Sequence, residues 1–265
     1  MTVAVHFLAF AGQRSDADAV EYQVKLTNVG IQGLEFVLGG GLPEDSVYLL
    51  TGKPGTYYTT FAQQAVVNHL SRKGMAVYYS AEVGSADLRQ DMFVYGWDVK
   101  PYIDDGSLLF ARPSPPQLQT FTEVMPTVPY EQHIKMTSAS MGALSKDFLS
   151  RLKEGRWSIL NLSYLMNLYP AQEVTDLMMF WVNAVHRYGG VHFVTLLDGA
   201  HEEKQVTFLK NLVDGVFNFR FVEGFGQSEG EVEVQKLRKV VPKAKTFRHV
   251  VQSDGLFVET TARIG

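Results

Sequence analysis

The chain of 265 residues contains no cysteine. Disulfide bonds, thiolate metal ligands and cysteine nucleophiles are therefore excluded. A chain without disulfides is compatible with a reducing compartment, and we expect a cytoplasmic protein. The seven histidines are scattered, and no two of them have the His-x-x-x-His spacing of a helical zinc site. The sequence therefore predicts no metal site built on cysteine or histidine.

Long hydrophobic runs are also missing. No stretch approaches the roughly 20 apolar residues of a membrane-spanning helix. The apolar segment 1–11 is short and lacks the basic flank typical of a secretory signal. We expect a strand or a partner-docking segment at Val3–Phe10, followed by a polar linker over 12–26. The sequence thus predicts no membrane association.

No excess of basic charge is present. Lys and Arg number 24 against 28 Asp and Glu, and the formal net charge is -4. This balance argues against a nucleic-acid partner, which normally requires a basic surface. The apolar fraction of 46% is enough to build a buried core. We therefore expect a folded protein without a broadly basic surface, although a local basic patch is still compatible with this charge.

Short apolar runs alternate with segments of helical periodicity from residue 46 onward. The expected strands are 46–51, 76–80, 107–110, 157–162 and 191–197, and the expected helices lie near 61–70, 88–95, 144–152 and 174–188. From 216 to the end, alternating runs separated by turn residues indicate hairpins. Together they predict an α/β fold with a mainly parallel sheet between helices and an antiparallel C-terminal edge.

The domain organisation follows from the same pattern. We expect an N-terminal extension over 1–26 and a single domain over 27–265. Five of the ten prolines lie within 113–132. This density predicts an irregular surface segment inside the domain and not a boundary between two domains.

A glycine-containing loop follows the first expected strand and precedes the first expected helix. Its sequence is Gly52-Lys53-Pro54-Gly55-Thr56-Tyr57-Tyr58-Thr59-Thr60. A phosphate-binding loop has the pattern G-x-x-x-x-G-K-[ST] in this context, and its backbone amides, lysine and hydroxyl hold the phosphates and Mg²⁺. Here Tyr57 replaces the second glycine and Tyr58 replaces the lysine. The loop alone is equally compatible with an ordinary strand–turn–helix corner.

Both replacements remove something that nucleotide chemistry uses. The glycine lets the backbone approach the phosphates closely, whereas Tyr57 adds a bulky ring and restricts φ and ψ. Tyr58 can donate one neutral hydrogen bond but carries no positive charge for a phosphoryl group. We therefore expect ATP binding to be weak or lost.

The surroundings of the loop resemble the KaiC branch of the RecA superfamily. The motifs that carry the resemblance are Gly30-Ile31-Gln32-Gly33-Leu34-Glu35, Gly39-Gly40-Gly41-Leu42-Pro43, Tyr79-Ser80-Ala81-Glu82, Tyr95-Gly96-Trp97-Asp98, Asp214-Gly215-Val216 and Lys236-Leu237-Arg238. They run from about Thr27 to the end, and the block 27–60 is the most specific. The resemblance implies a RecA-like P-loop core.

The resemblance also implies roles for single residues. Glu82 stands where the family has the acid that polarises the attacking water, although a strand-end carboxylate facing solvent is an equal alternative. Thr59 matches the hydroxyl position of Mg²⁺ binding, and Asn161 matches the aspartate that organises Mg²⁺. Asn can hydrogen-bond a metal-bound water but brings no negative charge, so we expect Mg²⁺ binding to weaken.

In the family, the Lys-x-Arg pair reaches a nucleotide held by the neighbouring subunit. Lys236 and Arg238 match it and would share one face of a strand. Their alternative role is that of charges on a solvated edge strand. Lys53 stands where the deviant phosphate loops of ParA and MinD ATPases place a lysine that acts in trans, so it could replace the charge missing at Tyr58. A variable exposed lysine is the alternative.

Two functions are consistent with these residues. The first is a catalytically inactive, regulatory or assembly subunit, which forms a homo-oligomer or joins an active paralogue. The second is a weak ATP-binding protein or slow ATPase that uses Glu82, with Lys236 and Arg238 acting in trans.

Overall fold

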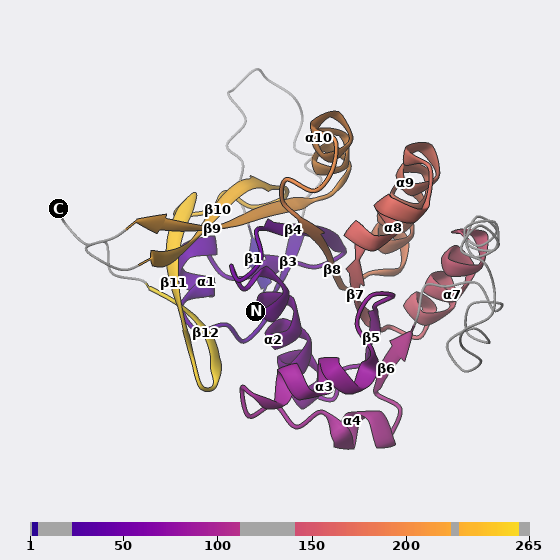
Figure 1. Ribbon diagram of the computed structural model, residues 1–265. Coiled ribbons are helices and arrows are strands. Elements are labelled where there is room, and N and C mark those ends of the chain that lie inside the picture. Colours follow the sequence, from indigo (N-terminus) through magenta and orange to yellow (C-terminus); the bar gives the residue numbers. More distant parts are fainter. Residues whose placement is uncertain (1, 5–22, 112–140, 224–227, 260–265) are drawn as a thin grey trace, which may run out of the picture.

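The computed structural model describes residues 2–4, 23–111, 141–223 and 228–259. Its centre is a nine-stranded sheet in the order β12-β11-β10-β9-β4-β8-β7-β5-β6 (Figure 1). The strands of this sheet are β4 (Ser46–Gly52), β5 (Ala76–Tyr79), β6 (Leu108–Ala111), β7 (Trp157–Asn161), β8 (Val191–Leu197), β9 (Gly215–Glu223), β10 (Ser228–Leu237), β11 (Thr246–Gln252) and β12 (Gly255–Val258). A second sheet joins β1 (Thr2–Ala4), β2 (Gln23–Thr27) and β3 (Leu42–Pro43).

The strands β4 to β9 pair in parallel, and β9 to β12 pair antiparallel. The expected α/β fold with an antiparallel C-terminal edge is therefore confirmed. β9 forms the expected hairpin with β10 and in addition pairs in parallel with β4, so the C-terminal hairpins continue the parallel part of the sheet. Its first residues, 215–217, are buried on both faces, which suits a central strand, whereas Arg220 and Phe221 farther along are exposed.

Helices cover both faces of the large sheet (Figure 1). One face carries α1 (Leu34–Leu38), α2 (Tyr58–Ser71), α3 (Ser85–Phe93) and α4 (Lys100–Asp104). The opposite face carries α7 (Met141–Lys153), α8 (Leu162–Leu168), α9 (Ala171–Tyr188) and α10 (Glu203–Leu212). Side chains of β4 alternate between these two cores, so Tyr48 and Leu50 pack with α2 whereas Val47 and Leu49 pack with α9.

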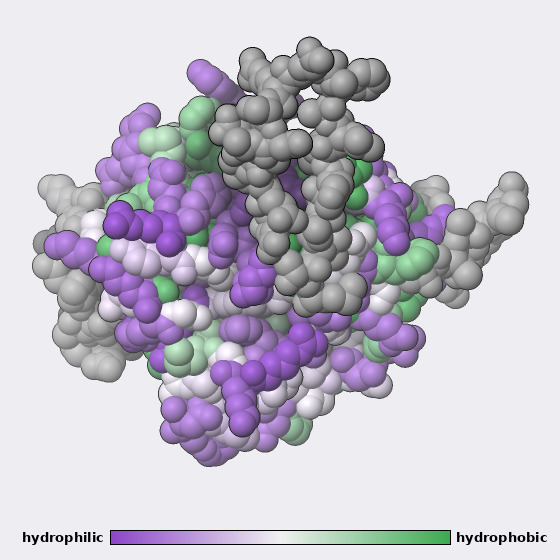
Figure 2. Space-filling model, turned by 180° about the vertical axis from the view of Figure 1, so that it is seen from behind, coloured by the Kyte–Doolittle hydropathy of each residue, from purple (hydrophilic) through white to green (hydrophobic). Residues whose placement is uncertain are grey.

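Figure 2 shows that hydrophilic residues dominate the described surface in its view, with apolar residues in small groups. The large apolar side chains lie mainly in the two cores, and Trp181, Tyr48 and Phe61 are fully buried. Among the described residues, no helix combines the length and apolar character that crossing a membrane requires.

The short helices α1, α4 and α8 were not expected. Each has five to seven residues, which is too short to show a helical period in the sequence. The expected strand at Val3–Phe10 is described only as far as β1, and β2 occupies the end of the expected linker over 12–26. The proline-rich segment 113–132 lies outside the described residues.

Candidate functional site

The loop from Gly52 to Thr60 joins the carboxyl end of β4 to the first turn of α2. A Cβ atom placed on Gly52 would lie 2.3 Å from Thr56 Oγ1 and 2.8 Å from the Tyr58 ring, so only glycine fits there. Thr56 donates both its amide and its hydroxyl to the Lys53 carbonyl, at 3.2 and 2.8 Å. The loop is therefore closed upon itself, with the Thr56 side chain buried inside it.

Tyr57 has the backbone conformation of a glycine. Its φ of 66° and ψ of 16° lie in the left-handed region, and it is the N-cap of α2, where its carbonyl accepts from the Phe61 amide at 3.0 Å. The Tyr57 ring meets the His249 ring edge to face at 6.4 Å. The loop thus keeps the backbone turn for which the missing glycine would be suited, and Tyr57 bears the conformational cost.

Tyr58 turns back under the loop. Its ring is half-buried, lies against Gly52 and packs on the core beneath α2. Burial raises the pKa of the phenol, a hydrogen bond to Thr59 opposes the rise, and Glu82 adds a smaller increase. The phenol stays neutral at physiological pH, so Tyr58 supplies no positive charge. The remaining groups that favour an anion here are the free amides of the first turn of α2 and the helix dipole.

Glu82 lies just after the end of β5 and Asn161 is the last residue of β7, and the structure brings their side chains together. Asn161 Nδ2 donates to Glu82 Oε2 at 2.8 Å. The other half of the same amide caps α8, because Asn161 Oδ1 accepts from the Ser163 amide at 3.2 Å. The two positions that the resemblance linked to chemistry are therefore adjacent at the carboxyl edge of the sheet.

The residues present can be tested against the nucleotide and Mg²⁺ that a RecA-like fold implies. The left-handed turn at Tyr57 and the free amides at the start of α2 form a backbone cradle that suits a phosphate group, whereas the space at Gly52 is filled by the Thr56 side chain and the Tyr58 ring. The metal position does not fit, because the Asn161 amide presents a donor and not an oxygen toward Glu82. In the part of the chain that the structure describes, no group of three His, Asp or Glu side chains could hold a metal ion.

The segment after β8 borders the loop. The Asp198 amide donates to the Gly52 carbonyl at 2.9 Å, which places Asp198 beside the start of the loop. His201 Nε2 is buried without a partner among the described residues, and burial lowers the pKa of its imidazole. Lys53 is exposed at the tip of the loop.

Lys236 and Arg238 lie far from the loop of their own chain. Lys236 pairs with Val216, and Val216 pairs with Leu49, three residues before Gly52. At about 3.3 Å per residue this puts Lys236 roughly 10 Å back along the strands. Its side chain lies on the face that carries α10, whereas α2 covers the other face. In cis, neither residue can therefore take part in the same site as Glu82.

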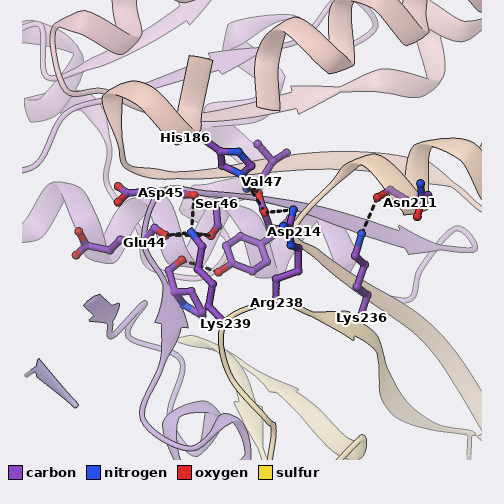
Figure 3. Close-up of polar contacts among 12 residues, drawn as sticks. Glu44, Asp45, Ser46, Val47, His186, Asn211, Asp214, Lys236, Arg238 and Lys239 are labelled. Atoms are coloured by element: carbon purple, nitrogen blue, oxygen red, sulfur yellow. Dashed lines mark hydrogen bonds and ion pairs between the residues drawn. The ribbon is translucent and has the colours of Figure 1, made fainter. Parts of the chain in front are cut away.

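Both side chains have partners within the chain (Figure 3). Lys236 Nζ donates to the carbonyls of Asn211 at 2.7 Å and Lys210 at 3.3 Å, in the last turn of α10. Arg238 Nη1 lies 3.4 Å from Asp214 Oδ1, and burial lowers the pKa of Lys236. Arg238 stands just beyond the end of β10, and both side chains reach partners on the side of the sheet that carries α9 and α10.

Asp214 is the centre of a polar cluster. In the sequence this residue stood out only as part of the motif Asp214-Gly215-Val216. Its carboxylate is buried and accepts from the Val47 amide at 3.0 Å and from His186 Nε2 at 2.9 Å (Figure 3). Its own backbone bonds to Val47 and Arg238. This cluster ties β4, α9 and the end of β10 together at the edge opposite the phosphate loop. No sequence signal indicated His186.

Residues 27–262 match the family model described as ATPase: KaiC. The chain belongs to the KaiC family of ATPases. It shares 44% identity over 77 residues with a UPF0273 protein of Pyrococcus horikoshii, covering 29% of this chain and 31% of that protein. It shares 32% identity over 92 residues with the circadian clock protein KaiC3 of Synechocystis. That match covers 35% of this chain and 18% of KaiC3. These matches span a third or less of the relatives' lengths.

A solved KaiC-like protein of Pyrococcus horikoshii OT3 has the same fold. The TM-score is 0.71 at 18% identity, and the similarity covers 89% of this chain and 99% of that one. The resemblance to the KaiC branch and the RecA-like fold are therefore confirmed. The roles expected for Glu82, Asn161, Lys236 and Arg238 stay predictions.

Proposed function

We propose that this chain is a KaiC-family subunit that holds a nucleotide phosphate weakly at the loop 52–60 and does not hydrolyse it. The observation that carries the proposal is Tyr58. At the position where the lysine of a phosphate loop stands, a neutral, half-buried phenol lies against Gly52. Phosphoryl transfer depends mainly on positioned positive charge, and this site has lost that charge.

The bond between Asn161 and Glu82 supports the same proposal. Glu82 is the one carboxylate at the expected base position, and Asn161 Nδ2 already donates to it. The Glu82 oxygen that this amide occupies is not free to position an attacking water. The left-handed turn at Tyr57 supports binding without turnover, because the backbone cradle keeps its shape.

The biological role that suits such a subunit is regulation or assembly in the cytoplasm, with a partner that is another copy or an active paralogue. RecA-like active sites form between subunits, and Lys236 and Arg238 lie too far from their own loop to serve it. We propose a single domain over 27–265, with 1–26 as an extension, and no nucleic-acid partner.

Phosphate release from Mg-ATP tests the proposal. Wild-type protein should release phosphate no faster than the variant Glu82→Gln, and both should be equal to buffer. Hydrolysis by the wild type that Glu82→Gln abolishes would overturn the proposal in favour of a slow ATPase. Asp91→Asn, an exposed carboxylate on α3, is the matched control for charge removal.

Thermal unfolding with millimolar ATP or ADP measures the binding part. Ligand at 100 times its dissociation constant adds about 2.7 kcal/mol to stability. We expect a smaller but reproducible rise in Tm, and Tyr58→Lys should increase that rise because the charge is restored. No rise with either nucleotide, in wild type and Tyr58→Lys alike, would contradict binding at this loop. Light scattering of the same samples gives the assembly state.

A further inference from the structure

The oxygen and the nitrogen of the Asn161 side-chain amide each make a different hydrogen bond. Its oxygen accepts from the Ser163 amide at 3.2 Å and caps α8, and its nitrogen donates to Glu82 Oε2 at 2.8 Å. The reverse orientation would put an NH₂ group against a backbone N–H and an oxygen against a carboxylate. Both contacts would be repulsive, so the hydrogen bonds assign the orientation of the amide.

This orientation determines what can occupy the space beside Glu82. A divalent cation binds through oxygen, and it would meet the donor end of the amide. To present oxygen, Asn161 would have to rotate, which breaks the bond to Glu82 and also removes the cap from α8. The amide thus satisfies the Glu82 carboxylate in the way that a cation otherwise would.

We propose that Asn161 replaces a divalent cation at this edge of the sheet, so that the site takes a phosphate ester, a nucleotide above all, in its metal-free form. The inference about the ligand rests on the proposed phosphate binding at the loop 52–60. The replacement of the cation stands on the Asn161–Glu82 contact and can be tested without nucleotide.

Asn161→Asp is the decisive variant. Aspartate caps a helix as well as asparagine does, so the cap on α8 remains. It places a second carboxylate against Glu82, however, and two like charges at this distance repel unless a proton or a cation lies between them. Without metal we expect the Tm to fall by about 2–4 °C. Millimolar Mn²⁺ or Mg²⁺ should restore it, whereas the Tm of the wild type should be equal in EDTA and in metal.

Two control variants make the result specific. Glu82→Gln combined with Asn161→Asp exchanges the donor and the acceptor, so the hydrogen bond and the net charge are kept. We expect its Tm to return toward that of the wild type and to ignore metal. Asn167→Asp adds the same charge to an exposed position of α8 and should not create a response to metal.

The outcomes separate this inference from the proposed function. If Mn²⁺ or Mg²⁺ raises the Tm of the wild type, or if Asn161→Asp does not respond to either ion, the replacement of the cation is wrong whatever the nucleotide does. With ATP or ADP as ligand, the wild type should show the same Tm rise in EDTA as in Mg²⁺. A rise that appears only with Mg²⁺ contradicts the metal-free ligand, whereas phosphate release from ATP contradicts only the absence of hydrolysis.

Discussion

Tyr57 shows how one residue can keep a loop in a shape that suits another residue type. Its φ of 66° costs a non-glycine residue about 1–2 kcal/mol. The ring recovers part of this cost, because its edge-to-face contact with His249 and its partial burial are favourable. The backbone cradle is therefore held by side-chain packing and not by the freedom of a glycine.

Two substitutions at this residue separate the backbone from the ring. Tyr57→Ala and Tyr57→Gly both remove the contact with His249, but only glycine adopts a positive φ without strain. We expect Tyr57→Gly to be more stable than Tyr57→Ala by about 1 kcal/mol, measured by urea unfolding. Equal free energies of unfolding for the two variants would show that the left-handed turn is not present in solution.

At the scale of elements, the carboxyl end of α10 depends on a side chain from a distant strand. Lys236 reaches the last carbonyls of this helix from β10, where no residue of α10 itself can satisfy them. Its Nζ is partly desolvated, and burial lowers its pKa, which is the pattern of a lysine used as a structural donor. The bulge between Val234 and Lys236 accompanies this placement.

Lys236→Met keeps the aliphatic stem and removes the donor. We expect a loss of about 1 kcal/mol in the free energy of unfolding, together with faster hydrogen exchange of the α10 amides. Lys245→Met removes an exposed lysine of the segment that follows β10 and should change stability by less than about 0.5 kcal/mol. If Lys236→Met leaves α10 exchange unchanged, the lysine does not cap the helix in solution.

The core strands were predictable because each is a short apolar run, and the helices α2, α7 and α9 because each carries a helical period. β8 agrees residue for residue with the expected range 191–197, and α9 begins three residues before the expected 174. The motifs around Gly52 were likewise sufficient to predict the RecA-like fold and the position of the loop between β4 and α2. The contact between Glu82 and Asn161 was not predictable, since it depends on the register of β5 beside β7 and on the orientation of one amide.

At the scale of the whole molecule, three histidines on three different elements are shielded from water: His192 and His249 are buried, and His69 is half-buried. Burial lowers the pKa of each to about 4: His69 on α2, His192 on β8 and His249 on β11. His192 bonds to Ser158 at 2.8 Å, His69 stacks on Trp157, and neither ring nitrogen of His249 has a partner among the described residues. All three are therefore neutral in the folded protein at pH 7.

These histidines predict a stability that falls with acid. Each pKa is lower in the folded chain than the ordinary value of 6.5, so the unfolded chain binds more protons below that pH. The contribution of the three neutral histidines to the free energy of unfolding is fully present above about pH 6.5 and is lost as the pH falls toward 4. At pH 5 the loss is about 2 kcal/mol for each histidine, and three together approach the total stability of a typical domain. We expect unfolding near pH 5, measured by circular dichroism across a pH series.

His249→Leu tests whether His249 accounts for its part of the stability that the protein loses in acid. The imidazole is 3% exposed and loses no hydrogen bond when leucine replaces it, so stability at pH 7.5 should be kept or raised. The loss between pH 7.5 and pH 5 should shrink by about 2 kcal/mol, because one proton-binding difference between the unfolded and folded chains disappears. If the free energy of unfolding in urea falls with pH by the same amount in the variant and in the wild type, His249 is not buried as a neutral ring behind Tyr57. The left-handed turn at Tyr57 would then lack the ring contact with His249 that packs against it.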